Sequence, residues 1–149
     1  KAMENLKKYN LINYLKGYAL DNRPLIGICL GMQLFAENST EITNSDGLGI
    51  IPGIIEPINY PKWHIGWNNI DVSKDSCLEA FNKLEVYYNH SFSYNCSKQF
   101  IHATSNIGNE NKSIVACVKK NNTIGLQFHP EKSQTVGLSL FENLFSQLL

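Results

Sequence analysis

The apolar residues of this chain recur at two different periods, which separate the expected helices from the expected strands. Residues 2–20 carry apolar side chains at helical spacing and predict one amphipathic helix. Its apolar face consists of Leu6, Tyr9, Ile12, Leu15 and Ala19. Residues 135–149 predict a second helix. Its apolar stripe consists of Val136, Leu140, Phe141, Leu144, Phe145 and Leu148.

Short apolar runs between these two helices predict strands, because they are bounded by turn-forming residues. The expected strands cover residues 25–28, 50–58, 65–72, 86–88, 91–95, 99–103, 114–119 and 124–128. A helix is expected to start over residues 32–37, and a short helical turn over residues 76–83. No internal repeat or linker interrupts this alternation, so the 149 residues are expected to form one α/β domain with a sizeable core.

A cysteine between two glycines follows the first expected strand, in the segment Gly27-Ile28-Cys29-Leu30-Gly31-Met32-Gln33. The glycines let the backbone turn sharply from a strand into a helix, and such a turn exposes the side chain at its tip, as in a nucleophile elbow. Because a helix N-terminus favours negative charge, we expect Cys29 to be a reactive thiolate near neutral pH. A small buried cysteine is the alternative, and the two glycines argue against it.

A histidine and a glutamate follow the last expected strand, in Phe128-His129-Pro130-Glu131-Lys132-Ser133. Pro130 ends the strand, because proline cannot donate a ladder hydrogen bond. Side chains two residues apart in extended backbone point the same way, so Glu131 can reach one ring nitrogen of His129 while the other faces a substrate. Such a pair supplies the base and the orienting carboxylate that a cysteine nucleophile requires. Without Cys29, a strand-end histidine beside a solvated glutamate would be the preferred interpretation.

Together the two segments resemble a class I glutamine amidotransferase domain with a Cys-His-Glu triad. Three further segments, in the family's order, resemble the glutaminase subunits of imidazole glycerol phosphate synthase. They are residues 47–53 (Gly-Leu-Gly-Ile-Ile-Pro-Gly), 64–68 (His-Ile-Gly-Trp-Asn) and 87–92 (Tyr-Tyr-Asn-His-Ser-Phe). Sister glutaminases, such as that of pyridoxal phosphate synthase, lack the last two. The resemblance covers the whole chain and implies a flavodoxin-like fold, with a mostly parallel sheet and flanking helices.

The resemblance implies that the chain hydrolyses L-glutamine to glutamate and ammonia. Cys29 would attack the side-chain carboxamide, and the backbone N–H of Leu30 would hold the developing oxyanion. His129 would protonate the leaving ammonia and then activate water, while Glu131 would fix the imidazole tautomer.

The same resemblance assigns residues to the substrate. Gln33 and Glu41 would hold the amino-acid end of glutamine, and the backbone at Ser91 and Phe92 would hold its carboxylate side. No cofactor is implied. No metal is implied either, because the mechanism needs none and the other histidines show no ligand spacing.

Ammonia is useful only when it is delivered, so the resemblance also implies a synthase partner. In the family this partner is a (β/α)8-barrel cyclase subunit that forms imidazole glycerol phosphate in histidine biosynthesis. Trp67, Tyr87 and Lys132 would lie at the face where ammonia leaves, with ordinary core packing as the alternative for Trp67. Trp63 replaces the usual proline and Phe92 the usual tyrosine. These changes leave open a paralogue that supplies ammonia for an aminated or amidinated surface sugar.

The composition of the chain also indicates which other classes of partner are not expected. Lys plus Arg and Asp plus Glu each number 13, so the formal charge of zero suggests neither a nucleic-acid nor an anionic-membrane partner. The longest apolar stretch, residues 25–36, is too short to span a bilayer. Four cysteines without CxxC spacing or a disulfide framework are typical of a reducing compartment. No signal peptide is recognised, so we expect a cytoplasmic protein.

The sequence departs from the family at the start of the chain. There the family has a first strand, a helix and a Pro-Gly-x-Gly loop that completes the oxyanion hole, and Lys1 corresponds to a point just after that loop. We therefore expect residues 1–149 to be an N-terminally incomplete domain that lacks this strand-loop region, or a second chain to supply the strand.

Two functions of a different class also fit parts of the sequence. The chain could be an inactive binding module, for which the missing loop argues and against which the intact triad argues. It could also be a cysteine hydrolase that acts without a partner. Gln33, Glu41 and residues 89–92 (Asn-His-Ser-Phe) argue against this, because all of them suit glutamine.

Overall fold

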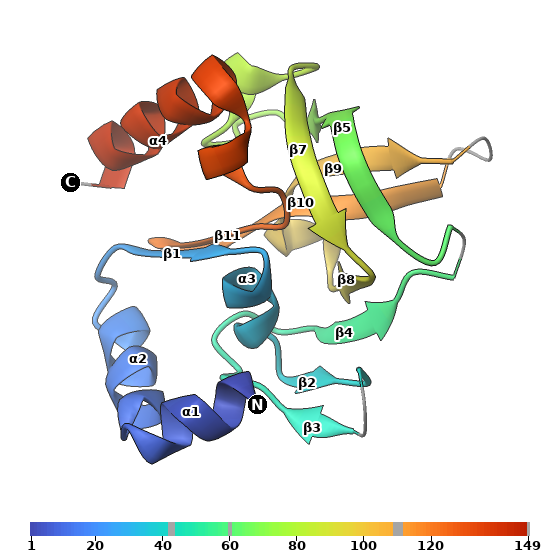
Figure 1. Cartoon of the computed structure of the whole chain (residues 1–149). Helices are drawn as coiled ribbons and strands as arrows, with labels where there is room; N and C mark the ends of the chain where they lie inside the picture. Colours follow the sequence, from blue (N-terminus) through green and yellow to red (C-terminus); the bar gives the residue numbers. More distant parts are fainter. Residues whose placement is uncertain (42–43, 60, 109–111, 149) are drawn as a thin grey trace.

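A five-stranded sheet forms the centre of the computed structural model, which describes residues 1–41, 44–59, 61–108 and 112–148. Its strands, in spatial order, are β1 (Leu25–Ile28), β11 (Thr123–Leu126), β10 (Lys112–Lys120), β9 (Ile101–Ile107) and β6 (Asp71–Val72). Figure 1 shows α4 on one side of this sheet and α1, α2 and α3 on the other. The expected α/β class with flanking helices is confirmed.

The sheet is mixed, so the expectation of a mostly parallel sheet was wrong. β1 and β11 pair in parallel, with Ile28 opposite Leu126, whereas the other three neighbouring pairs are antiparallel. The reason lies in the connections. Only Asn121 and Asn122 separate β10 from β11, and a connection this short reverses the chain, whereas parallel neighbours need a long crossover.

Two smaller sheets flank the central one. The first has the order β3 (Ser45–Asp46), β2 (Asn38–Ser39), β4 (Ile54–Pro57) and β8 (Phe92–Asn95). The second pairs β5 (His64–Asn69) with β7 (Glu85–His90) in antiparallel fashion. The strand expected over residues 50–58 is therefore only β4, because Ile50 and Ile51 are buried in a loop ahead of it. The strand expected over residues 65–72 splits at Ile70 into strands of different sheets.

The helix expected over residues 2–20 is two helices, α1 (Ala2–Lys8) and α2 (Leu11–Leu20). Asn10 separates them because its φ of 55° lies in the left-handed region, where asparagine is better tolerated than most residues. α3 (Leu30–Leu34) follows β1, and α4 (Gln134–Leu148) ends the described chain. Single 3₁₀ turns are η1 (Glu79–Phe81), η2 (Lys98–Phe100) and η3 (Pro130–Lys132). None of the helices in the described ranges could cross a membrane.

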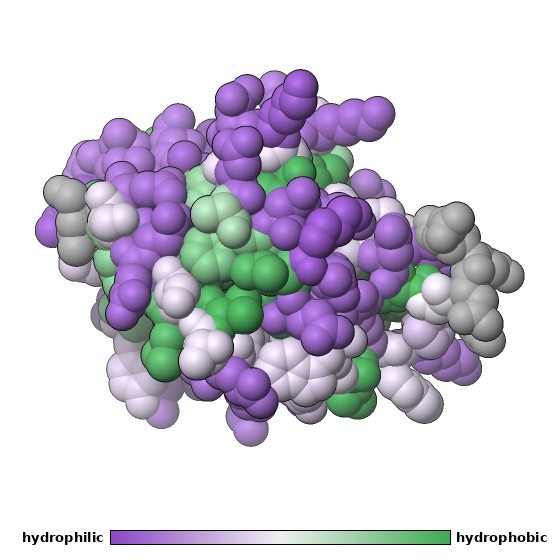
Figure 2. All heavy atoms as spheres, turned by 90° about the horizontal axis from the view of Figure 1, so that it is seen from above, coloured by the Kyte–Doolittle hydropathy of each residue, from purple (hydrophilic) through white to green (hydrophobic). Residues whose placement is uncertain are grey.

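Two apolar clusters pack against the central sheet. Leu140 and Leu144 of α4 join one cluster, and Met32 of α3 joins the other together with the apolar faces of α1 and α2. Apolar side chains also reach the surface in the middle of the face that Figure 2 shows from above, among hydrophilic ones. β1 and β11 lie between the two clusters. The Cys29 segment follows β1, and the segment with His129 and Glu131 follows β11.

Candidate active site

Cys29 lies in a sharp turn between β1 and α3, as the sequence predicted. Its φ of 48° and ψ of −104° are unusual for a residue with a side chain. The backbone is held on both sides of this turn. The Cys29 N–H donates to Leu126 O at 2.7 Å, and its carbonyl accepts from the Gln33 N–H at 3.1 Å. The strained geometry therefore belongs to a fixed backbone, as at a nucleophile elbow.

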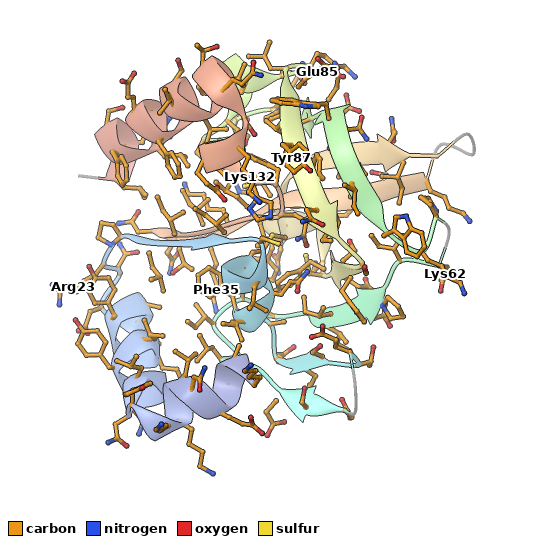
Figure 3. All side chains as sticks on the ribbon, viewed as in Figure 1. Arg23, Phe35, Lys62, Glu85, Tyr87 and Lys132 are labelled. Carbon is orange, nitrogen blue, oxygen red and sulfur yellow. The ribbon has the colours of Figure 1, made fainter. Side chains whose placement is uncertain are left out.

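The two glycines around the cysteine differ in what they allow. A Cβ at Gly27 would lie 2.6 Å from the Phe35 ring and 2.7 Å from the carbonyl carbon of Gly31, so only glycine fits there. Figure 3 labels Phe35 just after α3, below β1. A Cβ at Gly31 would meet nothing within 4 Å. We expected neighbouring atoms to approach both glycines closely, and in the structure they do so only at Gly27.

The thiol of Cys29 contacts two other segments. Its Sγ donates to Asn89 O at 3.8 Å and accepts from Gln127 Nε2 at 3.8 Å. Burial raises the pKa of the Cys29 thiol, and the charge of Glu131 raises it further, although the Leu30 N–H and Lys132 lower it. This direction contradicts the expected thiolate, because the loss of solvation outweighs the groups that lower the pKa. The thiol is protonated at neutral pH and needs a base.

His129 lies after β11, where the chain turns into η3. The backbone N–H of His129 donates to Tyr87 O at 2.8 Å, and its backbone carbonyl accepts from the hydroxyl of Ser133 at 2.7 Å. The expected contact with Glu131 is present, with Nδ1 and Oε1 2.7 Å apart. Because a carboxylate only accepts, Nδ1 carries the proton and a neutral ring leaves Nε2 free to act as a base.

The parallel pairing of β1 and β11 brings the two motifs to one edge of the sheet. Ile28 is opposite Leu126, so Cys29 follows one strand where Gln127 and His129 follow the other. Gln127 was missed by sequence reasoning, yet it is fully buried and joins the Cys29 thiol to Gln33, whose Nε2 lies 3.2 Å from Gln127 Oε1. A glutamine inside an apolar run was the signal that could have found it.

The residues predicted to bind substrate are only partly together. Leu30, Gln33 and Glu41 line one cavity of about 330 Å³, within the range of small-molecule sites. Gln33 Nε2 also donates to Phe92 O at 3.2 Å, which ties the backbone of β8 to this cavity. Ser91 is exposed, and its carbonyl accepts from the Ile58 N–H at 2.9 Å.

Trp67, Tyr87 and Lys132 form a row beside the triad segment. The Trp67 and Tyr87 rings meet edge to face with centroids 5.8 Å apart, and Lys132 Nζ lies 5.9 Å from the centroid of the Tyr87 ring. Figure 3 shows Lys132 and Tyr87 next to one another. Trp67 is 45% exposed, so the core-packing alternative was wrong. In the described ranges no group of three or more His, Cys, Asp and Glu side chains could hold a metal ion.

The family model for class-I glutamine amidotransferases matches residues 5–148 of this chain. The chain belongs to the class-I glutamine amidotransferase family. Its fold agrees with that of a glutamine amidotransferase from Thermotoga maritima, with a TM-score of 0.57 at 17% identity. That match covers 95% of this amidotransferase chain and 56% of the other one.

Two relatives show which members of the family this amidotransferase is similar to. Imidazole glycerol phosphate synthase subunit HisH of Bacillus cytotoxicus is 38% identical over 149 residues, which is 96% of this chain and 69% of the relative. Subunit HisH 1 of Campylobacter jejuni is 40% identical over 150 residues, 96% of this chain and 73% of that one. The resemblance found in the sequence is therefore confirmed at the level of the family.

Proposed function

We propose that this chain is the glutaminase subunit of an imidazole glycerol phosphate synthase. It hydrolyses L-glutamine and passes the ammonia to a (β/α)8-barrel cyclase subunit in histidine biosynthesis. One observation carries the proposal: the ends of two adjacent parallel strands present the Cys29 thiol and the His129–Glu131 pair, which is hydrogen-bonded at 2.7 Å. The names of the two relatives support the choice of pathway. We place the complex, a heterodimer, in the cytoplasm.

The reaction begins with proton transfer, because the Cys29 thiol is protonated at rest. His129 Nε2 takes this proton, and Glu131 stabilises the imidazolium through its bond to Nδ1. The thiolate adds to the carboxamide carbon of glutamine, and the Leu30 N–H holds the oxyanion, a contact worth ~3 kcal/mol in such sites. His129 then protonates the departing ammonia. A water molecule, activated by the same ring, hydrolyses the glutamyl thioester.

Glutamine is held by residues of the cavity that Leu30, Gln33 and Glu41 line, and Gln127 links Gln33 to the Cys29 thiol. Gln33 uses its amide nitrogen on Phe92 O and Gln127 Oε1, so its own Oε1 is left to accept from the substrate's ammonium group. Glu41 supplies the negative charge that this ammonium group requires. The backbone at Ser91 and Phe92 binds the substrate's carboxylate side.

The cyclase subunit docks on the outer face of β5 and β7. Trp63 and Ile65 are well exposed for large apolar residues, at 61% and 60%, and they lie on or next to the strand of Trp67. Exposed aromatic side chains are typical of protein–protein interfaces. Trp67, Tyr87 and Lys132 would line the exit of ammonia toward the partner.

Glutamate release tests the proposal. The full-length gene product is assayed alone, with the co-encoded barrel cyclase, and with the cyclase plus its ribonucleotide ligand. We expect a rate that rises sharply with the liganded partner and vanishes in Cys29→Ala. Cys96→Ala is the matched control, because Cys96 is half-buried outside the site and its loss should leave the rate unchanged. No hydrolysis with any partner would leave a binding module. Hydrolysis with a different synthase alone would move the protein to a surface-sugar pathway.

A further inference from the structure

The side chains of Asn68, His64 and His90 form a line of hydrogen bonds between β5 and β7. The catalytic steps of the proposed mechanism do not use this line. Asn68 Nδ2 lies 3.3 Å from His64 Nε2, and His64 Nδ1 lies 3.1 Å from His90 Nε2. His90 Nδ1 lies 2.7 Å from Phe92 O. This is the carbonyl that accepts from Gln33, so the line runs from β5 to the cavity of the glutamine site.

Each hydrogen bond in this line has one possible direction. Phe92 O can only accept, so His90 Nδ1 carries the proton and donates. The neutral His90 ring then accepts at Nε2, which requires His64 to donate from Nδ1. His64 Nε2 is left to accept from the Asn68 amide, whose nitrogen also donates to Asn106 O at 2.6 Å. Both rings are thus fixed in their Nδ1–H form.

Both rings are buried and neutral. His64 is 8% exposed and His90 is 7% exposed. Burial and, to a smaller extent, His90 lower the pKa of His64 to about 4. Burial lowers the pKa of His90 to about 4 as well, with a smaller contribution from His129 and against the bond to Phe92 O, which raises it. The His64 ring also stacks on Tyr88 with centroids 4.2 Å apart. Neither ring can turn without losing a buried hydrogen bond.

The outer end of the line belongs to the strand that carries the partner face. His64 and Trp67 lie on β5, with His64 buried and Trp67 exposed. The antiparallel register sets His64 opposite His90 and Trp67 opposite Tyr87. A partner that presses on Trp67 therefore acts on the strand that holds His64.

We infer that His64 and His90 are positioning residues, which hold the Phe92 carbonyl and Gln33 in place and couple the partner face of β5 to the glutamine pocket. This inference rests on the proposed glutaminase function. Neither histidine touches the substrate. They act through the Phe92 carbonyl and Gln33, whose other contact, Gln127, reaches the Cys29 thiol.

Two variants of His64 separate this role from ordinary packing. His64→Phe keeps a ring on Tyr88 and removes both nitrogens, whereas in His64→Asn the amide nitrogen can replace Nδ1 as the donor to His90. His102→Phe is the matched control, because His102 lies on β9 outside the line and its buried Nδ1 has no hydrogen-bond partner among the residues that the structure describes. Each full-length variant is assayed for glutamate release with and without the liganded barrel cyclase, and its affinity for the cyclase is measured separately.

We expect His64→Phe to raise the KM for glutamine and to reduce the stimulation by the partner, each by about tenfold, the worth of one hydrogen bond. Affinity for the cyclase should stay unchanged. His64→Asn should recover most of the loss, and His102→Phe should behave like wild type. A folded His64→Phe with unchanged KM and stimulation overturns the inference alone. A wild-type protein that never hydrolyses glutamine overturns the proposed function and this inference with it.

Nitrogen-15 NMR of the wild-type protein gives a second readout that needs no variant to fold. Both His64 and His90 should be neutral at pH 7 with the proton on Nδ1. An Nε2–H tautomer at His90 would break the line at Phe92 O and overturn the inference, whatever the kinetic results.

Discussion

Gly137 of α4 lies against the carbonyl oxygen of Pro130, so closely that a Cβ at residue 137 would be 1.8 Å from it. The Gly137 N–H also donates to Ser133 O at 3.0 Å. Pro130 separates His129 from Glu131, so the first turn of α4 fixes the backbone that carries both proposed catalytic side chains.

Gly137→Ala should therefore destabilise the protein and impair catalysis together. We expect a loss of about 1–3 kcal/mol in the free energy of unfolding, because the new methyl group must push the Pro130 carbonyl away. Gly17→Ala is the control. Its Cβ would meet nothing within 4 Å inside α2, so it should stabilise the protein by about 0.5–1 kcal/mol. Urea unfolding and glutamate release measure both effects, and a fully active, stable Gly137→Ala would contradict this account.

Glu131→Gln should make the thiol more acidic and the enzyme slower. The negative charge of Glu131 raises the pKa of Cys29, so its removal lowers that pKa. An amide cannot hold the imidazolium as a carboxylate does, so kcat should fall by about 10²–10⁴-fold. The pH dependence of thiol alkylation by iodoacetamide gives the first effect, and glutamate release gives the second.

Lys132→Met should shift the alkylation profile to higher pH, because Lys132 lowers the Cys29 pKa. Shifts in the same direction for both variants would sink this prediction.

The buried histidines should make the fold sensitive to acid. Their pKa values of about 4 in the folded protein lie below the ordinary 6.5, so between pH 6.5 and 4 the unfolded chain binds protons that the folded protein excludes. The free energy of unfolding should therefore fall as the pH falls through this window, by up to about 1.4 kcal/mol per pH unit for each histidine. Above pH 6.5 this stability is fully present. Urea unfolding from pH 7 to 5 should show a smaller slope for His64→Phe than for wild type, and equal slopes would refute the prediction.

Trp67→Ala should weaken the partner complex without unfolding the subunit. The side chain is nearly half exposed, so its removal should cost little free energy of unfolding, whereas an aromatic residue at the centre of an interface contributes about 2 kcal/mol or more to binding. Titration of the barrel cyclase by calorimetry measures the affinity. Tyr14→Ala, which removes an exposed aromatic side chain from α2, should bind the cyclase like wild type. Equal losses in the two variants would point to a general effect on the fold.

Local sequence signals predicted the segments whose structure depends on neighbours in the chain. The strand at residues 25–28, the turn at Cys29 and the contact between His129 and Glu131 all follow from residues within a few positions of one another. The closing helix, expected over residues 135–149, is α4 (Gln134–Leu148), with residue 149 outside the described residues.

Structural features that depend on contacts between residues far apart in the chain were not predicted from the sequence. Ile50 and Ile51 have the composition of a strand, yet they are buried in a loop that contacts Phe35 through backbone hydrogen bonds. The Gln127 contacts and the His64–His90 pair need the register of strands that are far apart in sequence. The pKa of Cys29 depends on how deeply the folded chain buries its thiol, and a helix N-terminus predicted from the sequence does not reveal this.

The positive φ of Cys29 means that this chain would be more stable if it gave up its chemistry. A glycine at position 29 would relieve backbone strain of about 1 kcal/mol or more, since glycine alone adopts such angles freely. A search for stabilising substitutions would therefore select Cys29→Gly, a sturdier protein that can no longer attack glutamine. Some of the stability that the fold allows is thus given up at the residue that, in the proposed reaction, attacks glutamine.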